Sequence, residues 1–487
     1  MFGDYVLEKT SAAYDNKILL LDDEGLDAAT GYSAAFAAQG FEVVRYKDDL
    51  SFRIEYEDKL KASGGKIVVM ADSGSYIPYD VHRRLRGYAI SMGKLFPKLN
   101  EDYLREHPEL DMELLTQAYK ENFDDLRERH KTEEFIKAKV YGRDNVLRYV
   151  HRLKEHILQL AADAKTYKDW FAISEEKAKI DVLSTQHHLR VVTAETNRAF
   201  RDWVLGNFGK LSTELSNSTP VLVSRAMEYM HSHSEKFVVI VMDGMSQFDW
   251  QIISRSFAGI PYEKTNIMAM IPSTTSVSRQ CLLADKYPSQ LMEPWKQSKE
   301  KAEFIACAKD MGFSDSQIGY ERGYEATFGS FVRCGAVIIN DVDDMVHAQQ
   351  QGRLGMYNDI GVMADEGKLA RMVKRFVAEG FDVYITADHG NTPCTGLGKL
   401  VGTGLEVETK SRRMLVLQDF ANKAALLDKY GLIEYPKYYL KKDFDCLICE
   451  VGDSFDAKGE QVMTHGGISI DEVVVPFIKI KAGKHHG

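Results

Sequence analysis

Five short segments of the chain carry side chains that suit metal-assisted phosphoryl transfer. In order along the sequence they supply aspartates, histidines and one hydroxyl group: Asp243, Thr275, Asp343 with His347, Asp388 with His389, and His465. Carboxylates and imidazoles without thiolates are typical ligands of Zn²⁺ or Mn²⁺ rather than of copper or iron–sulfur centres. Seven side chains are too many for one tetrahedral ion. They therefore indicate two divalent metal ions, with zinc as the first choice and manganese as the alternative.

Four of these segments follow short apolar runs that predict β-strands. The runs at residues 237–242, 267–271, 336–339 and 383–386 lead to Asp243, to the turn at 272–276, to the acids around Asp343 and to Asp388. Short apolar runs that alternate with helical patterns are typical of parallel strands, and open α/β sheets collect ligands at the carboxyl ends of their strands. The sequence thus predicts a parallel α/β sheet with the site at one edge.

The acidic stretch after the third run contains more than one candidate ligand. Asp343 and His347 are four residues apart, so one helical turn presents both side chains to the same ion. This spacing favours Asp343, with Asp341 and Asp344 as alternatives.

The remaining ligands depend on turns. Asp388 and His389 are adjacent, and Gly390 permits the tight turn that aims both side chains at one centre. His465 stands in the turn-like segment 463–469, which leads into the apolar strand predicted at 473–478. A single histidine is more often a structural residue than a ligand, but the ordered set favours ligands.

Thr275 is the predicted nucleophile. It lies in a hydroxyl-rich turn, where a metal ion lowers the pKa of a hydroxyl group, and Ser273, Thr274 and Ser276 are the alternatives. Serine and threonine also favour helix N-caps, and both interpretations hold if the transferring group lies at a helix N-terminus. Arg279, one turn further on, adds positive charge there.

Sequence patterns divide the chain into three predicted domains. Residues 1–84 alternate a strand, an alanine-rich helix and two strands, which predicts a small α/β domain of Rossmann-like or receiver-like type. Residues 85–219 carry apolar side chains at helical spacing and predict a helical domain. Residues 220–487 contain the candidate site.

The N-terminal domain has an acidic cluster of its own. Asp22, Asp23 and Asp72 follow predicted strands, which is typical of a receiver domain that chelates Mg²⁺. A receiver also needs a lysine at the end of its last strand, and no such lysine follows Asp72. We therefore favour a degenerate interaction or dimerisation domain whose acids cap helices.

Composition narrows the classes of function. The chain has 487 residues, 44% of them hydrophobic and 28% charged, and a formal net charge of −10. This charge argues against a broad duplex-DNA-binding surface and leaves a local basic groove open. No signal peptide or membrane span is evident, so we expect a cytoplasmic protein without membrane partners. The six cysteines suit reduced thiols, and the lone pair Cys446 and Cys449 is a weak zinc or redox signal.

The second half of the chain resembles a PglZ domain, a branch of the alkaline phosphatase superfamily, over residues 220–480. The resemblance rests on Val-Met-Asp243-Gly-Met, Pro272-Ser-Thr-Thr275-Ser, Asp343 with His347, Ala-Asp388-His389-Gly-Asn391, and Thr-His465-Gly-Gly-Ile-Ser with Glu472 and Pro476 behind it. The first half is more loosely similar to the front of PglZ proteins from BREX phage-defence loci, through Asp22-Asp-Glu-Gly25, Phe52-Arg53 with Tyr56-Glu57, and Ile77-Pro-Tyr-Asp80.

The resemblance implies a fold and a ligand set. The fold is an alkaline-phosphatase-like α/β sandwich preceded by the small α/β domain and the helical domain. One ion is then held by Asp343, His347 and His465, and a second by Asp243, Asp388 and His389, with Thr275 between the second ion and phosphorus. Arg279 and Asn391 are the predicted substrate-binding residues.

The expected function is hydrolysis of phosphate esters, first of all nucleotide-type diesters, in phage defence. One alternative is a phosphomonoesterase or phosphomutase on the same site. The other is a scaffold in a defence complex whose metal site is structural. The expected partners are a phosphate-ester substrate, including nucleic acid or oligonucleotide, other defence-system proteins, and a second copy of the chain in a homodimer.

Overall fold

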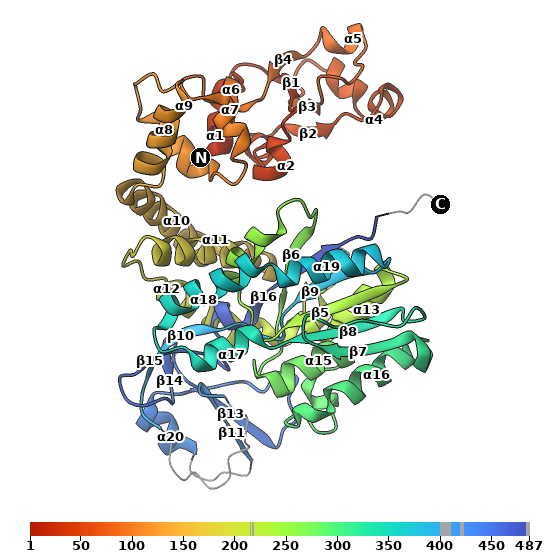
Figure 1. Ribbon diagram of the computed structural model, residues 1–487, viewed down its shortest axis with the longest axis vertical. Helices are drawn as coiled ribbons and strands as arrows, with labels where there is room; N and C mark the ends of the chain where they lie inside the picture. The colour runs from red at the N-terminus through yellow and green to blue at the C-terminus, as the bar shows by residue number, and fades with distance from the viewer. Residues whose placement is uncertain (215, 217–218, 400–410, 419–422, 484–487) are drawn as a thin grey trace. The chain divides into compact units, whose positions relative to one another are not determined.

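The computed structural model describes residues 1–214, 216, 219–399, 411–418 and 423–483. The chain forms two compact units, Met1–Tyr149 and Val150–Gly487, and helix α10 (Arg143–Asp163) runs across the division between them. This division falls inside residues 85–219, so helices of the predicted helical domain belong to both units (Figure 1). Among the residues described, no helix is both long and apolar enough to cross a bilayer.

The first unit contains a four-stranded parallel sheet in the order β2–β3–β1–β4. Its strands are β1 (Lys17–Leu21), β2 (Glu42–Arg45), β3 (Ile67–Ala71) and β4 (Arg86–Ala89). Its helices are α1 (Phe2–Lys9), α2 (Leu26–Thr30), α3 (Ser33–Ala38), α4 (Asp49–Lys61), α5 (Tyr79–His82), α6 (Met92–Leu95), α7 (Glu101–Glu106), α8 (Met112–Lys120), α9 (Arg129–Phe135) and η1 (Ile136–Val140). The predicted small α/β fold is therefore present.

Strand β4 corrects the prediction for this unit. It lies past residue 84, in a stretch expected to be helical, and pairs with β1 at the edge of the sheet. Its side chains are mostly exposed, so no apolar run marks it in the sequence. The backbone of β1 supplies the hydrogen bonds that extend it, and Ile90 N continues the pairing by donating to Leu21 O at 2.8 Å.

The second unit is built on a six-stranded sheet in the order β6–β16–β9–β5–β8–β7. These strands are β5 (Phe237–Met242), β6 (Glu263–Met268), β7 (Ile318–Arg322), β8 (Cys334–Ile339), β9 (Asp382–Thr386) and β16 (Val474–Ile480). Strand β16 runs antiparallel to both of its neighbours, β6 and β9, so β6 points in the same direction as the rest. The carboxyl ends of the other five strands consequently share one edge, as predicted.

The strand predicted from the apolar run at residues 267–271 differs from the observed one in its bounds and in its pairing. The strand β6 ends at Met268, and its hydrogen-bonding partner is the antiparallel β16 rather than a parallel neighbour. The chain then leads through Ile271 into the turn that holds Thr275. Strand β5, by contrast, is buried along its whole length, which explains why it reads as a continuous apolar run.

Helices cover both faces of this sheet (Figure 1). Helices α18 (Gly352–Glu366) and α19 (Lys368–Ala378) lie on one side, and α15 (Gln280–Ala284) and α16 (Glu300–Asp310) lie on the other. This unit also contains α11 (Tyr167–Gln186), α12 (Ala194–Asn207), α13 (Ala226–His233), α14 (Gln247–Ile253), α17 (Asp341–Ala348) and α21 (Ile470–Val473). A sheet with helices on both faces is the expected α/β sandwich.

Two small sheets are formed by segments that lie between β9 and β16 along the chain. The first contains β10 (Thr392–Gly396), β14 (Asp453–Ser454) and β15 (Gln461–Thr464), and the second contains β11 (Met414–Gln418), β12 (Ile433–Glu434) and β13 (Phe444–Ile448), beside α20 (Lys423–Tyr430). Cys446 and Cys449 are buried free thiols here, and burial raises the pKa of the Cys446 thiol to about 12. The Cys-X-X-Cys pair thus resembles a packed pair of thiols rather than a redox motif.

Candidate active site

The seven predicted ligand and nucleophile residues converge from five places on the fold. They come from the end of β5 (Asp243), the short helical turn η5 at Thr275–Arg279, helix α17 (Asp343 and His347), the turn after β9 (Asp388 and His389) and the turn after β15 (His465). Six of them form two groups of three, and within each group the ligand atoms lie within 4.8 Å of one another. The sheet edge and two turns thus bring together residues up to 222 positions apart, from Asp243 to His465.

The first group consists of Asp343, His347 and His465. The Nε2 atoms of His347 and His465 each lie 3.4 Å from an oxygen of Asp343. The group contains Asp343 rather than Asp341 or Asp344, which line a separate surface cavity. One turn of α17 therefore presents Asp343 and His347 on the same face, as their spacing predicts.

The second group consists of Asp243, Asp388 and His389, all buried. Thr275 borders it, because Thr275 Oγ1 lies 3.3 Å from Asp243 Oδ1 and 3.1 Å from His389 Nε2. The two groups adjoin one another, since the rings of His389 and His465 stack with centroids 4.1 Å apart. The hydroxyl group therefore stands at the border of a single two-part centre.

The backbone orients the two buried histidines. His389 Nδ1 lies 3.1 Å from Gly390 O, and His465 Nδ1 lies 3.3 Å from Ser273 O. When Nδ1–H donates to these carbonyl groups, Nε2 carries the lone pair that faces the carboxylates. Both rings thus present the donor atom that a metal ion requires.

The carboxylates of the centre lack sufficient partners within the protein. Asp388 Oδ2 and Asp343 Oδ1 are buried, and neither has a hydrogen-bond partner among the residues that the structure describes. Burial and the neighbouring charge of Asp388 raise the pKa of Asp243 well above its usual range, although Arg279 opposes the shift. Unpaired buried carboxylates are costly, and divalent cations remove that cost.

The imidazoles respond to the same surroundings. Burial, followed by the neighbouring imidazole of His389, lowers the pKa of His465 to about 3, so its ring is neutral at physiological pH. A neutral imidazole is the form that binds metal. Three carboxylates, three imidazoles and one hydroxyl group in two adjoining sets fit two divalent ions of the zinc or manganese type.

A family comparison now decides the class of the protein. A model of the BREX system PglZ alkaline phosphatase-like domain matches residues 222–480. The chain belongs to the PglZ family. This membership confirms the predicted resemblance and places the chain among the alkaline phosphatase-like phosphoesterases, which are hydrolases.

Comparisons with solved structures give remote likenesses. Murine ectonucleotide pyrophosphatase/phosphodiesterase 5 is 12% identical, with a TM-score of 0.34, over 50% of this chain and 88% of that chain. Phosphonoacetate hydrolase from Sinorhizobium meliloti 1021, in complex with phosphonoformate, is 11% identical, with a TM-score of 0.34, over 52% and 92% of the two chains. No curated protein matches the chain.

The two predicted substrate-binding residues of the PglZ domain have contacts within the protein. Arg279 is fully buried; its Nη1 contacts Asp243 Oδ2 and its Nε donates to Glu300 Oε2 at 2.7 Å. Its Nη2 has no hydrogen-bond partner among the described residues. Asn391 Nδ2 donates to Gly244 O at 2.9 Å and to Asp249 Oδ2 at 2.6 Å. Asn391 thus also braces the turn that follows Asp243.

Some residues that support the site were not among the predicted ones. Glu300 is buried beside Arg279, and Arg413 is buried in an ion pair with Glu472. Glu472 Oε1 accepts a hydrogen bond from Gly467 N at 2.8 Å, so this pair holds the turn that carries His465. Sequence offers little signal for Glu300 and Arg413, because each lies outside any motif and its burial depends on distant partners.

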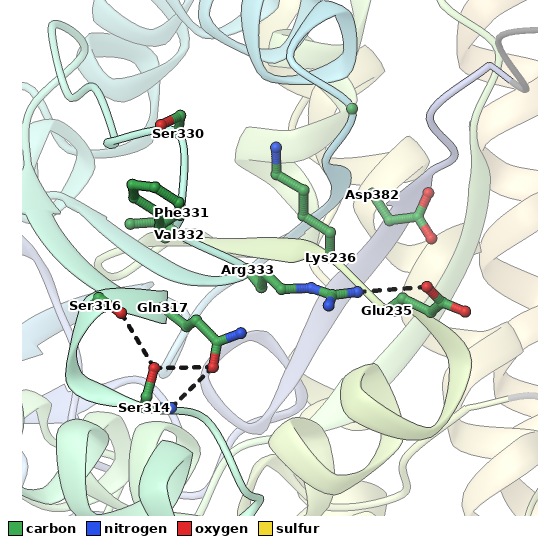
Figure 2. Close-up of a pocket in the computed structure, with 11 residues that line it drawn as sticks. Glu235, Lys236, Ser314, Ser316, Gln317, Ser330, Phe331, Val332, Arg333 and Asp382 are labelled. Carbon is green, nitrogen blue, oxygen red and sulfur yellow. Dashed lines mark hydrogen bonds and ion pairs between the residues drawn. The ribbon is translucent and has the colours of Figure 1, made fainter. Parts of the chain in front are cut away.

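A cavity of about 720 Å³ lies at the opposite edge of the sheet. It is lined by residues that precede or begin β5, β7, β8 and β9, among them Lys236, Gln317, Arg333 and Asp382. Figure 2 shows Arg333 paired with Glu235 across this cavity, with Nη2 and Oε2 3.4 Å apart. It contains none of the metal-ligand candidates and is not part of the candidate active site.

Proposed function

We propose that this PglZ protein is a metal-dependent phosphodiesterase that cleaves nucleotide-type diesters with Thr275 as its nucleophile. The observation that carries the proposal is the position of Thr275 Oγ1, within 3.3 Å of Asp243 Oδ1 and 3.1 Å of His389 Nε2. The hydroxyl group thereby borders a buried set of carboxylates and imidazoles that requires cations.

Two divalent ions, zinc first and manganese as the alternative, are the proposed cofactors. Asp343, His347 and His465 would hold one ion, and Asp243, Asp388 and His389 would hold the other beside Thr275. Bound there, the ions would lower the pKa of the threonine hydroxyl group and neutralise negative charge on the phosphoryl oxygens and the leaving oxygen.

The chain itself supplies the nucleophile and its alignment. Thr275 begins the helical turn η5, so its side chain stands where free backbone N–H groups favour an anion. Thr275 Oγ1 attacks phosphorus, the bond to the leaving alcohol breaks, and a phosphothreonine forms. Water then cleaves the bond between phosphorus and Oγ1, which releases a phosphate monoester and restores the threonine.

The charges near Thr275 favour a diester over a monoester. A monoester carries an additional negative charge, which requires additional cations directed at its oxygens. Arg279 supplies one guanidinium group, but Asp243 and Glu300 already share its charge. Arg413 is paired with Glu472 and braces a turn instead. A singly charged diester needs less compensation, so we infer a diester preference.

The biological setting that we propose is phage defence as part of a BREX system, because the family model carries that description. Other defence-system proteins and a nucleic acid or oligonucleotide substrate are the partners that this setting implies. A homodimer is an additional partner proposal.

The direct test is a pair of model esters. Protein stripped with chelator and reloaded with zinc or manganese should cleave bis(p-nitrophenyl) phosphate with a higher kcat/KM than p-nitrophenyl phosphate. The Thr275→Ala protein, prepared in the same way, is the control for adventitious hydrolysis.

Other outcomes would replace the proposal. A higher kcat/KM for the monoester would indicate a phosphomonoesterase or phosphomutase. Failure to cleave either ester, together with a Thr275→Ala protein that retains biological activity, would indicate a scaffold with a structural metal site.

A further inference from the structure

Arg322 is an exposed arginine at the same sheet edge as the candidate active site. It is the last residue of β7, and it lies opposite Ile338 of β8 in parallel register. Strand β8 leads directly into α17, which carries Asp343. The Arg322 side chain is 48% exposed, so it is accessible from solvent at the end of its strand.

A buried carboxylate fixes this arginine in place. Glu300, whose side chain is 3% exposed, accepts hydrogen bonds from Arg322 Nη2 and, at 2.5 Å, from the hydroxyl group of Tyr320. Its other oxygen accepts from Arg279 Nε at 2.7 Å, and Arg279 in turn contacts Asp243. Three successive contacts therefore connect the exposed Arg322 to a predicted metal ligand.

The charge of Arg322 is only partly compensated by this arrangement. Among the described residues, Glu300 is the one carboxylate that pairs with Arg322, and it also pairs with Arg279, which Asp243 contacts as well. A guanidinium group that is held rigidly, half exposed and incompletely neutralised is well suited to bind an anion such as phosphate.

Lysines extend the positive charge along this rim. Lys301 Nζ lies 5.5 Å from the centroid of the Tyr320 ring, next to Arg322. Lys296 precedes the short helix η7 (Gln297–Lys299) and Lys299 ends it, and this helix packs against the turn η5 that begins with Thr275. Glu293 pairs with both of these lysines, and Glu321 is the exposed acid beside Arg322. Among these described rim residues, cations outnumber exposed acids, although the whole chain carries a net charge of −10.

We infer that Arg322, supported by Glu300, binds a second phosphate group of the substrate while the scissile diester lies at Thr275. This inference rests on the proposed phosphodiesterase function and narrows its substrate class. The preferred substrate is then a phosphodiester that carries at least one further phosphate, as a nucleic acid strand or a nucleotide does, rather than an isolated diester.

The test compares two chromogenic esters that differ by one phosphate. The first is the p-nitrophenyl ester of thymidine 5′-phosphate, and the second is the same ester with an added 3′-phosphate. Because only the second ester can make a charge-assisted contact through its added phosphate, the wild-type protein should show a KM about tenfold lower for it. In Arg322→Ala the ratio of the two KM values should fall to near one, and Arg322→Lys should restore part of it.

Arg333 provides a matched control. It precedes the neighbouring strand β8, its side chain is 45% exposed, and it pairs with a glutamate, Glu235. It differs from Arg322 in lying at the opposite edge of the sheet, in the cavity of Figure 2. Arg333→Ala should therefore keep the wild-type ratio of KM values.

Binding gives a second measurement that does not depend on turnover. Thymidine 3′,5′-bisphosphate should bind the Thr275→Ala protein about tenfold more tightly than the Thr275→Ala/Arg322→Ala protein in calorimetry. A single-stranded oligothymidylate that binds far more tightly than the bisphosphate would indicate a nucleic acid strand, and equal affinities would indicate a nucleotide.

Two results would overturn the inference. If the wild-type protein cleaves both thymidine esters with equal KM, the second phosphate is not recognised, while the phosphodiesterase function stands. If Arg333→Ala lowers the ratio as much as Arg322→Ala does, the effect is one of net charge and not of a site. Cleavage of neither ester, by contrast, would contradict the proposed function itself.

Discussion

The two units each contain a set of parallel strands that end in aspartates, but the two sets of acids have different surroundings. In the first unit, Asp22 follows β1 and accepts hydrogen bonds from the backbone N–H groups of Leu26 and Asp27 at 2.9 and 2.8 Å. Asp23 accepts one from Ser73 N at 2.6 Å, and this hydrogen bond lowers the pKa of Asp23. These acids are satisfied by the chain.

In the second unit, two of the clustered acids each retain a carboxylate oxygen without a donor in the described part of the chain, although Asp388 Oδ1 accepts from backbone N–H groups. Asp388 Oδ2 and Asp343 Oδ1 are buried without hydrogen-bond partners among the described residues, and imidazoles surround them. An aspartate at a strand end therefore does not by itself indicate a metal site. The distinguishing features are unmatched oxygens, proximity to other acids, and histidine Nε2 atoms turned toward them.

The largest expected effect is a difference in bound metal between variants of the strand-end acids in the second unit and in the first. Asp388→Ala should lose the ion of the second group and reduce turnover of bis(p-nitrophenyl) phosphate by about a thousandfold, because a ligand and its charge are both removed. Asp22→Ala, the matched change in the first unit, should keep about two ions per chain. Elemental analysis and ester hydrolysis of both proteins measure the contrast.

This contrast is open to direct contradiction. Wild-type protein that contains no metal and takes up none from zinc or manganese would show that the unmatched carboxylates are not ligands. Equal metal loss in Asp388→Ala and Asp22→Ala would show that the acids of the two units do not differ in metal binding.

The next effect distinguishes the proposed nucleophile from the proposed ligands in the second unit, because turnover and metal content should respond differently. Thr275→Ala should abolish turnover, by about a thousandfold or more, and retain most of the bound metal, since it removes the proposed nucleophile and only one weak proposed ligand. Ser276→Ala is the control, because Ser276 is an adjacent hydroxyl group in the same turn. Near-wild-type rates in Thr275→Ala, or loss of activity in Ser276→Ala instead, would transfer the role to a neighbour.

Much of the second unit was predictable because its elements carry local signals. The strands β5 and β8 are apolar throughout, β9 is apolar at residues 383–385, and each leads to a polar residue at the shared edge. The four-residue spacing of Asp343 and His347 places both on one face of α17. Such features depend on short stretches of sequence, so a single chain reveals them.

The remainder depends on contacts between distant segments. Glu300 acquires its role from Arg279 and Arg322, which lie 21 and 22 residues away, and neither partner belongs to a strand–turn motif that predicts the contact. The exposed edge strand β4 lacks an apolar run, and β6 pairs with a strand from the end of the chain. Pairing between distant segments determines these strands, and no local sequence pattern predicts that pairing.

A smaller effect is expected from the satisfied acids of the first unit. Asp22→Ala removes the acceptor of two N–H groups at the start of α2 and should destabilise that helix by about 1 kcal/mol. Hydrogen exchange at the amides of Leu26 and Asp27 should accelerate accordingly, while Mg²⁺ should leave the wild-type exchange rates unchanged. Protection by Mg²⁺ would instead indicate a cation site at this edge, and the comparison would fail.

The last effect concerns Asp249, whose carboxylate combines features of the acids in both units. Its Oδ2 accepts from Ser246 N at 2.8 Å and from Asn391 Nδ2 at 2.6 Å, whereas its Oδ1 is buried without a hydrogen-bond partner among the described residues. It belongs to neither group of metal-ligand candidates. Burial raises the pKa of Asp249 to about 6, although the donors from Ser246 and Asn391 oppose the shift.

The sign of the resulting pH dependence follows from that shift. The folded protein holds the Asp249 proton up to about pH 6, and the unfolded chain loses it near pH 4. Between these values the folded state binds more protons, so this group's contribution to the free energy of unfolding falls as the pH rises from 4 to 6.

Asp249→Asn removes the titration. The change in unfolding free energy between pH 4.5 and pH 7 should therefore differ from that of the wild-type protein by about 1–2 kcal/mol in urea denaturation. If the two proteins show parallel pH profiles, then one buried oxygen without a donor among the described residues, Oδ1 of Asp249, does not lower the free energy of unfolding when the carboxyl group is charged.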